Sequence, residues 1–552
     1  MLLFAETFLL VVSAAIAAIG YGYGLSAILR IESNLGDRGI LGLLGLGVTA
    51  SLAQFVVPLT PAVHYAILVV GVILALVSLG SVPNPRFVWA SALIIFLFTL
   101  SHQQSAYSYD TGLYHLQTMR WMTEHRIVPG LGNLHGRLAF NSMLFLIDGA
   151  IDRSGIGWIP NLLVMFFALL SLVIRLWNFT SRGGISALEW WLLVLAIVTL
   201  AVNHYIAGWY GVLNADPFIA ILILYWTSVA LGLSSSPNLA ADFAMVVLTA
   251  VFALAIKLSA APLLLPAVAF GWLFRRRLTA GSQGRLAAMA CLIIVVWMMR
   301  SVVLSGCALY PVSQTCITTL PWAESPNQVN EESLAIRSWA REPGENDYAR
   351  VLKDQAWIPQ WIGATLRSHS IRVFAVFAPL GLIVAFLKKP YAGEPARCLL
   401  VVTCGLLGCL IFWFVAAPNL RFGEGFFLAA ALLGGSIAFA AFFDHSRFVV
   451  YMPRFVLACM AVVSIRGLWR PQSEYFYSVP EVATYELRGP SGHRIFVPKV
   501  LNQCWNHPLP CTPYFDPAAL AKIKWPADLP IPPPGSIPDR WAGVGTMNAE
   551  AK

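Results

Sequence analysis

Charged residues are scarce in this chain. Asp, Glu, Lys and Arg together make up 11% of its 552 residues, and apolar residues make up 58%. Soluble domains carry about 25% charged residues, so this composition excludes an ordinary soluble fold. The net charge of +9 is spread over short connectors without a basic, aromatic-rich patch, which argues against a nucleic-acid partner. We therefore predict an all-α polytopic membrane protein.

Several common catalytic signatures are also missing. The sequence has no P-loop, no Rossmann glycine pattern, and no HExxH or GxSxG motif in a supporting context. It shows no internal repeat, and the lack of an inverted repeat argues against a secondary transporter. Any chemistry must come from residues outside these motifs.

Apolar stretches long enough to cross a bilayer, roughly 17 to 25 residues, recur along the chain and predict about fourteen transmembrane helices. The transmembrane domain then covers residues 1–465, and 466–552 form a small extracytoplasmic tail. The first span lacks the basic region and cleavage site of a signal peptide, so we expect it to be retained. The predicted spans are 3–28, 39–59, 62–82, 87–101, 157–175, 187–204, 217–233, 243–256, 261–274, 286–304, 372–387, 398–416, 426–443 and 448–465.

Basic residues lie in alternate short loops, which the positive-inside rule places in the cytoplasm. The two longest loops, 102–156 and 305–371, then share the outer face with 205–216, 417–425 and the tail. We expect membrane lipids to surround the spans.

Cysteine spacing supports this orientation. Cys307 with Cys316, and Cys504 with Cys511, form close pairs in predicted outer segments. An oxidising outer compartment would join each pair as a disulfide. The tail pair lacks the spacing of a zinc site. The other five cysteines lie in apolar spans: Cys291, Cys398, Cys404, Cys409 and Cys459.

The first long loop concentrates polar side chains. Asp110, His115, Arg120, His135 and Arg137 lie within a few turns of one another in the sequence. Such a density of ionisable groups between apolar spans indicates a functional site. Within the loop, apolar residues at helical spacing predict an amphipathic helix over 110–125 that lies along the membrane surface.

Asp110 is the first candidate for catalysis. A carboxylate near the headgroup region could act as a general base on an acceptor hydroxyl, or could hold a divalent metal such as Mg²⁺ or Mn²⁺. Its position before Thr111 fits a helix N-cap equally well.

Tyr114, His115, His135 and Arg137 are the candidates around it. Either histidine could move a proton near neutral pH, bind a phosphate, or simply lie in the wet interface. Arg137 follows a glycine-containing loop that lets backbone approach a ligand, and its guanidinium matches phosphate geometry.

Three cations stand near the predicted outer ends of later spans: Lys257, Arg300 and Arg421. They could snorkel to the interface, or converge on an anionic lipid headgroup. Asp216 adds a secondary acidic position, which is also a plausible helix start because Pro217 follows it.

Four segments together resemble a group of bacterial polytopic membrane proteins linked to surface-polysaccharide synthesis: Tyr109–His115, Val128–Arg137, Ser305–Pro311 and Cys504–Cys511. The plan of the chain is similar to that of GT-C glycosyltransferases. The resemblance implies a catalytic or metal-binding acid in the first large outer loop, which maps onto Asp110, and a sugar donor carried on a polyprenyl phosphate. Two departures are that about four spans precede the loop instead of one, and that Asp110 has no acidic neighbour in sequence.

These observations predict an enzyme of the bacterial inner membrane, with its long loops and tail on the periplasmic side. It would transfer a sugar or glycan from a polyprenyl-phosphate-linked donor to a glycan or lipid-linked acceptor. Asp110 would be the base, with His115 close by. The expected substrate- or phosphate-binding residues are Tyr114, His135, Arg137, Lys257, Arg300 and Arg421.

Three alternatives stay open. A polysaccharide polymerase or ligase would depend on His135 or Arg137 and not on Asp110. A lipid-linked glycan flippase or transporter would bury charges in mid-helix. A non-catalytic assembly subunit would use the outer loops and the tail for docking.

Overall fold

Helices dominate the computed structural model, with one small sheet in the tail. The structure describes residues 2–78, 80, 84–101, 108–151, 157–182, 186–207, 213–345, 347–388, 392–443, 450–468 and 479–533. The last part of the predicted tail, 534–552, lies outside this range.

Eleven helices of the described part are long and apolar enough to cross a membrane, as a multi-pass membrane protein requires. They are α1 (Leu2–Leu29), α2 (Leu35–Gln54), α3 (Pro61–Ser78), α7 (Ile159–Arg182), α8 (Ala187–Ala207), α9 (Ala215–Leu231), α10 (Leu239–Ile256), α12 (Ala280–Ser305), α16 (His369–Lys388), α17 (Gly393–Ala416) and α18 (Leu420–Phe442).

Three shorter apolar helices fall where further spans are expected. They are α4 (Pro85–Ser101), α11 (Leu264–Phe274), which continues a 3₁₀ turn over Leu258–Leu263, and α19 (Met452–Leu468). The total of fourteen crossings stays a prediction.

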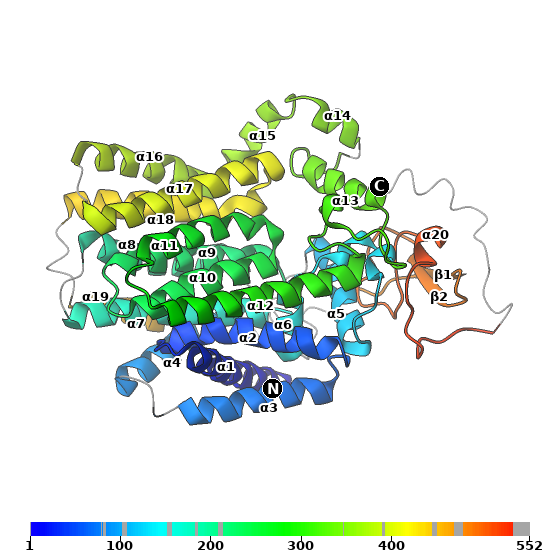
Figure 1. Ribbon diagram of the computed structural model, residues 1–552, viewed down its shortest axis with the longest axis horizontal. Coiled ribbons are helices and arrows are strands. Elements are labelled where there is room, and N and C mark those ends of the chain that lie inside the picture. The colour runs from blue at the N-terminus through cyan, green and yellow to red at the C-terminus, as the bar shows by residue number, and fades with distance from the viewer. Residues whose placement is uncertain are drawn as a thin grey trace.

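The segments predicted to be extramembranous gather at one end of the bundle, the right-hand end in Figure 1. The first long loop holds a π turn (Thr111–His115), α5 (Leu116–Glu124), two 3₁₀ turns (Leu131–Asn133 and Gly136–Ala139) and α6 (Met143–Ile151). The second loop holds a 3₁₀ turn (Ser313–Thr315), α13 (Pro326–Trp339), α14 (Tyr348–Lys353) and α15 (Ile358–Thr365). The tail holds β1 (Thr484–Arg488), β2 (Arg494–Pro498) and α20 (Pro517–Leu520).

The tail folds onto the first long loop. Leu487, Ile495 and Val497 of the antiparallel β1–β2 pair share one apolar core with Trp121 and Leu134 of the loop. The expected helix after Asp110 is present as the π turn and α5. Because the tail covers it, this helix is largely buried. Its place at the membrane surface stays a prediction.

Both expected disulfides are present. Cys307 pairs with Cys316 in the second loop, and Cys504 pairs with Cys511 in the tail. The five cysteines of the apolar helices are unpaired, as the spacing predicts.

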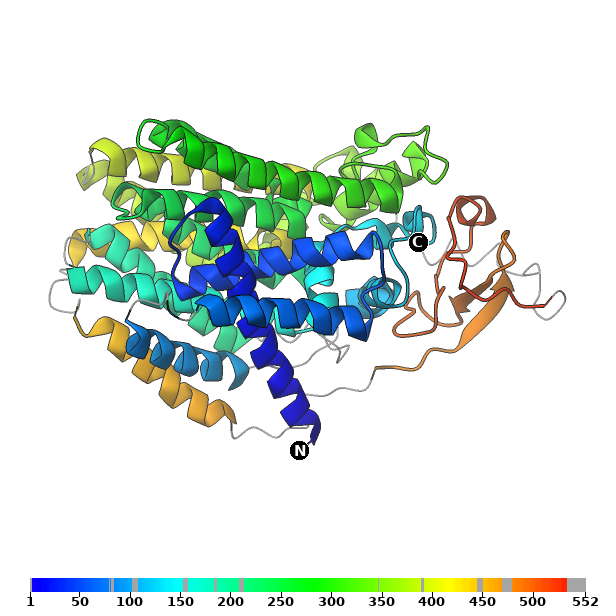
Figure 2. The same ribbon diagram turned by 60° about the horizontal axis from the view of Figure 1, so that its bottom comes forward.

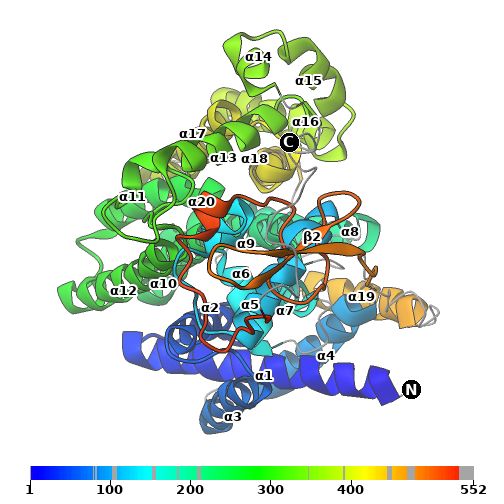
Figure 3. The ribbon, with the colours of Figure 1, turned by 90° about the vertical axis from the view of Figure 1, so that its right-hand side faces the viewer.

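The first helix crosses its neighbours obliquely. Figure 3 looks along the bundle, and α1 shows its length there while most helices are seen end-on; Figure 2 shows the same oblique crossing over α2 and α3. Small residues allow the close approach that such crossings need. A Cβ atom on Gly42 would lie 1.6 Å from the carbonyl oxygen of Ala18, and one on Gly20 would lie 1.8 Å from that of Gly71.

A buried ion network ties the helices together at the end opposite the loops. Arg175 of α7 contacts Asp37 of α2 and Asp242 of α10, each at 2.7 Å. Tyr225 of α9 donates to the other oxygen of Asp37 at 2.6 Å. The network therefore links four helices and satisfies charges that would be costly to bury alone.

We expect Gly42→Ala to destabilise the protein by about 1–3 kcal/mol, the usual cost of overpacking a core. The added methyl group would overlap Ala18 backbone on α1. Gly24→Ala is the matched control, because a Cβ there meets only the side chain of Leu74 at 3.7 Å. Thermal unfolding of the two detergent-purified variants measures the difference; equal melting temperatures would contradict the α1–α2 packing.

Candidate functional site

Four charged residues from four distant segments meet at the loop end of the bundle. Arg421 donates from Nη2 to Asp110 and from Nε to Asp216, each at 3.0 Å. Lys257 binds the other carboxylate oxygen of Asp216. We call these four residues the outer charge cluster. Asp110 and Arg421 are 311 positions apart in the sequence, so only the fold makes this group.

Helix ends hold the cluster in place. Asn214 caps α9 by accepting the Asp216 N–H at 2.9 Å, and Asn419 caps α18 by accepting the Arg421 N–H at 3.1 Å. Lys257 is the C-cap of α10. The helix dipoles favour Asp216 and Lys257 at these ends but disfavour a cation at the start of α18. The two carboxylates compensate Arg421.

Asp110 stands at the N-cap position of the π turn, but its side chain makes no capping hydrogen bond. Ser108 Oγ instead accepts the Thr111 N–H at 3.2 Å. Burial raises the pKa of the Asp110 carboxyl, but the His115 ring and the Arg421 guanidinium lower it, so that the net pKa lies below the usual value. Asp110 is therefore an anion at neutral pH.

The carboxylates of Asp110 and Asp216 differ in whether an oxygen is free to bind a ligand. Both oxygens of Asp216 are bound by cations, and its side chain is only 9% exposed. Asp110 is 21% exposed, and within the described chain its Oδ1 has no hydrogen-bond partner. Asp216 thus positions the cations, while Asp110 offers an oxygen to a ligand. Arg421 is 41% exposed and keeps Nη1 unused by any described residue.

His115 lies close to Asp110, as the sequence predicts. The π turn closes its hydrogen bond between residues five apart, so His115 follows Asp110 by about one turn. Burial lowers the pKa of His115 to about 4, which leaves the ring neutral at pH 7. Tyr114 packs edge-on against this ring at 4.4 Å and against Phe145 at 6.3 Å. Neither Tyr114 nor His115 therefore carries a positive charge that would attract a phosphate.

Arg137 lies beside the cluster, under the second long loop. Its Nε contacts Glu332 of α13 at 2.8 Å, and its guanidinium lies 5.3 Å from the Phe140 ring. Two turns further along α13, Trp339 lies 5.9 Å from the guanidinium of Arg421. Residues seven apart share a helix face and are about 10 Å apart along the axis. Helix α13 therefore covers both arginines.

Two predicted residues do not join this group. His135 is buried, and its Nδ1 accepts the Arg137 N–H at 3.0 Å as the cap of a 3₁₀ turn; burial lowers its pKa to about 3. Arg300 lies near the C-terminal end of α12, where it donates to Asn141 at 2.7 Å and Gln54 at 3.1 Å. The phosphate-binding role expected for these two residues stays a prediction.

The tail holds the Asp110 segment from outside, which the sequence reasoning missed. Within the Cys504–Cys511 loop, the Trp505 N–H donates to Gly112 O at 2.8 Å. Gln117 Nε2 donates to Trp505 O at 3.0 Å, and Gln503 Nε2 donates to Tyr109 O at 2.8 Å. A Cβ on Gly112 would lie 2.5 Å from the Trp505 ring, so only glycine allows this contact. In the sequence, the signal that could have pointed to this contact is the Cys504–Cys511 pair.

A buried acid of the second long loop was also missed. Glu324 is 4% exposed, and Tyr310 donates to it at 3.3 Å. Its carboxylate fills the space that a side chain at Gly132 would need, since Oε1 would lie 1.9 Å from a Cβ there. Burial, together with the nearby Glu332, raises the pKa of Glu324 to about 8. Glu324 is therefore mostly protonated at neutral pH.

The donor set does not fit a divalent metal. Across the described chain, no group of three or more His, Cys, Asp or Glu side chains is close enough to hold one. Asp110 and Asp216 share Arg421, and Arg421 and Lys257 already occupy three of their four oxygens. The ligand role expected for Asp110 toward Mg²⁺ or Mn²⁺ is therefore replaced by an ion pair.

One family model matches residues 1–428, and its description is a domain of unknown function, DUF8201. The chain belongs to this family. The match includes all four residues of the outer charge cluster and ends before the tail. No curated protein matches the sequence.

We expect the stability of this DUF8201 protein to depend on pH through Glu324. The folded state keeps a proton up to pH about 8, whereas the unfolded chain loses it near 4.5. The stabilising contribution is complete below pH 4.5 and is lost as pH rises through 8. Melting temperatures measured from pH 5 to 9 should fall over this window, and less so in Glu324→Gln. The exposed Glu331→Gln should keep the wild-type profile; an unchanged slope in Glu324→Gln would contradict the assignment.

Proposed function

We propose that this protein is a membrane glycosyltransferase of surface-polysaccharide synthesis. It would transfer a sugar or glycan from a polyprenyl-phosphate-linked donor to a glycan or lipid-linked acceptor. The observation that supports this most is the outer charge cluster, in which Arg421 joins a fixed carboxylate, Asp216, to one with a free oxygen, Asp110. Such a group at the end of a membrane bundle lies within reach of a lipid headgroup and of an acceptor from the aqueous side.

The unused oxygen of Asp110 accepts a hydrogen bond from the acceptor hydroxyl. The hydroxyl oxygen attacks the anomeric carbon of the donor, the bond from that carbon to the phosphate oxygen breaks, and the hydroxyl proton passes to Asp110. The phosphate leaves with the bonding electrons. Because the pKa of Asp110 is below its usual value, it takes the proton late, when the attacking oxygen has become acidic.

Cations stabilise the phosphate that leaves. Arg421 can offer Nη1 to a phosphate oxygen without losing its two carboxylates. Arg137 lies beneath the same face of α13 and interacts electrostatically with Asp110. Preorganised donors of this kind usually contribute the largest part of catalysis, because they need no rearrangement as charge develops.

Location follows from the same proposal. The protein would lie in the bacterial inner membrane with fourteen crossings, and the loops and tail at the cluster end would face the periplasm. The two disulfides support a periplasmic location for the second long loop and the tail, because the periplasm is oxidising. The tail would then be an extracytoplasmic cover on the Asp110 segment.

Asp110→Asn should lower transfer at least about 100-fold, because an amide cannot accept the hydroxyl proton. The assay uses membranes that lack the native protein, with a polyprenyl-phosphate-linked radiolabelled sugar as donor, and follows label into solvent-insoluble glycan. Asp354→Asn, on an exposed residue of the second loop, is the matched control. Binding of polyprenyl phosphate, read as a thermal shift relative to neutral polyprenol, should persist in Asp110→Asn. Full transfer by this variant would refute the assignment.

Arg421→Gln should weaken both transfer and the thermal shift with polyprenyl phosphate. Arg350→Gln is the matched control, because Arg350 also contacts two glutamates, at 2.5 and 2.8 Å, on an outer-loop helix away from the cluster. The polymerase or ligase alternative predicts a different ranking: His135→Ala or Arg137→Ala would abolish product while Asp110→Asn retained it.

A further inference from the structure

Arg300 is a buried cation without a described acidic partner. It is 2% exposed, and its two terminal nitrogens donate to neutral amide oxygens of Asn141 and Gln54. Its Nε has no hydrogen-bond partner among the described residues. A buried guanidinium is normally compensated by a carboxylate or by a bound anion. Among the described residues, the Arg300 guanidinium therefore lacks the negative charge that would compensate it.

The lining of the cavity beside Arg300 contains a further buried donor. The Nε1 atom of Trp121, which is 2% exposed, is also without a partner in the described structure. Among the lining side chains, Gln54 Oε1 accepts from Arg300, and the Thr118 hydroxyl donates its hydrogen to Tyr114 O. Two buried donors without a partner favour a ligand that accepts hydrogen bonds, such as an oxyanion.

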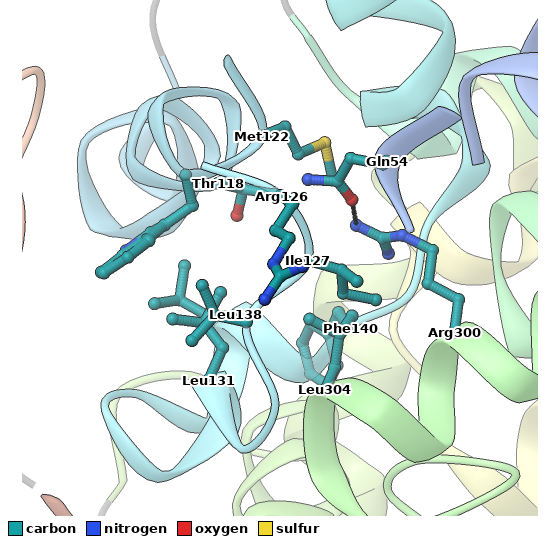
Figure 4. A pocket seen from close by; sticks show the side chains of 12 residues that line it. Gln54, Thr118, Met122, Arg126, Ile127, Leu131, Leu138, Phe140, Arg300 and Leu304 are labelled. Carbon is teal, nitrogen blue, oxygen red and sulfur yellow. Dashed lines mark hydrogen bonds between the residues drawn. The ribbon is translucent and has the colours of Figure 1, made fainter. Parts of the chain in front are cut away.

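A second arginine lies in the same cavity. Figure 4 shows the Arg126 side chain in the middle of the lining side chains, to the left of the Arg300–Gln54 contact. Arg126 is exposed and has no described ion-pair partner. The cavity thus carries two cations and opens toward solvent at Arg126.

The rest of the lining is apolar. It is formed by Met122, Ile127, Leu131, Leu138, Phe140 and Leu304. An inorganic anion gains nothing from such walls, whereas the first carbons of an esterified lipid would bury apolar surface against them. The end of α12, which carries Leu304, places the cavity at the level where membrane helices give way to outer loops.

This cavity is separate from the outer charge cluster. Its polar residues come from α2, α5 and α12 and the segment after α5, whereas the cluster is built on the starts of α9 and α18, the end of α10 and Asp110. Phe140 is the residue between them, because it lines the cavity and also contacts Tyr114 at 6.0 Å and Arg137 at 5.3 Å.

We propose that Arg300, Arg126 and Trp121 form a second site, which binds the phosphate group of an anionic lipid. Arg300 supplies fixed positive charge and Nε–H from inside, Trp121 supplies Nε1–H, and Arg126 closes over the phosphate from the solvent side. The apolar walls take the carbons next to the phosphate ester. The site does not depend on the transfer reaction proposed above, because it shares no residue with the outer charge cluster.

The test uses the full-length protein purified in detergent and three probes: dioctanoyl phosphatidic acid, inorganic phosphate and dioctanoylglycerol. Binding is measured as the concentration dependence of the thermal shift. Arg126→Gln and Trp121→Phe are the informative variants, because each removes donors while Arg300 still bridges Asn141 and Gln54. Arg367→Gln, another exposed arginine of the outer loops, is the control.

Phosphatidic acid should bind the wild type and the control equally, and at least about tenfold more weakly in Arg126→Gln, as expected for loss of a charge-assisted hydrogen bond. Trp121→Phe should weaken it as well. Inorganic phosphate should bind more weakly, with the same ranking of variants, and dioctanoylglycerol should not bind. If phosphate binds as tightly as phosphatidic acid, the site recognises free phosphate and the lipid assignment fails. Equal binding of phosphatidic acid by all variants, or of dioctanoylglycerol by the wild type, would overturn the site itself.

Discussion

The ion pairs that Arg421 makes with two carboxylates are the constraint on which this end of the molecule depends. A charge at the end of a membrane helix is costly unless an opposite charge reaches it. Two cations and two anions in the outer charge cluster compensate one another, so the four helix and loop ends that carry them must meet. The asparagine caps of α9 and α18, the cover of α13 and the contacts of the tail all hold those ends in one arrangement.

The same motif occurs at the opposite end of the bundle, and the comparison shows what makes the outer one a candidate site. Arg175 also lies between two aspartates, but its side chain is 12% exposed whereas that of Arg421 is 41% exposed. Tyr225 and Ser171 take up the remaining capacity of Asp37. The inner network is thus closed and acts as a structural tie. The outer one keeps an acceptor on Asp110 and a donor on Arg421 for a ligand.

Much of this arrangement can be predicted from the sequence, because it follows from local patterns. Apolar stretches locate the helices, and cysteine spacing identifies both disulfides. Asp110, Asp216, Lys257 and Arg421 stand out as charges at the ends of apolar segments. Which of them touch depends on helix packing, and no local pattern encodes that. Sequence reasoning therefore grouped Arg300 with Arg421, although Gln54 and Asn141 hold Arg300 elsewhere. It also missed Glu324, which lies between Tyr310 of its own loop and Gly132 of the first loop.

The distance in sequence between Asp110 and Arg421 has a consequence for biosynthesis. Asp110 is made 311 residues before its partner, which at 5–20 residues per second is a delay of about 15–60 s on the ribosome. During that time Asp216 and Lys257 can pair, but the cluster carries one negative charge in excess. The last quarter of the chain supplies the cation that balances it and the tail that covers it. A nascent chain that has not yet reached Arg421 therefore has no complete outer charge cluster, and the cluster forms only after that residue has been made.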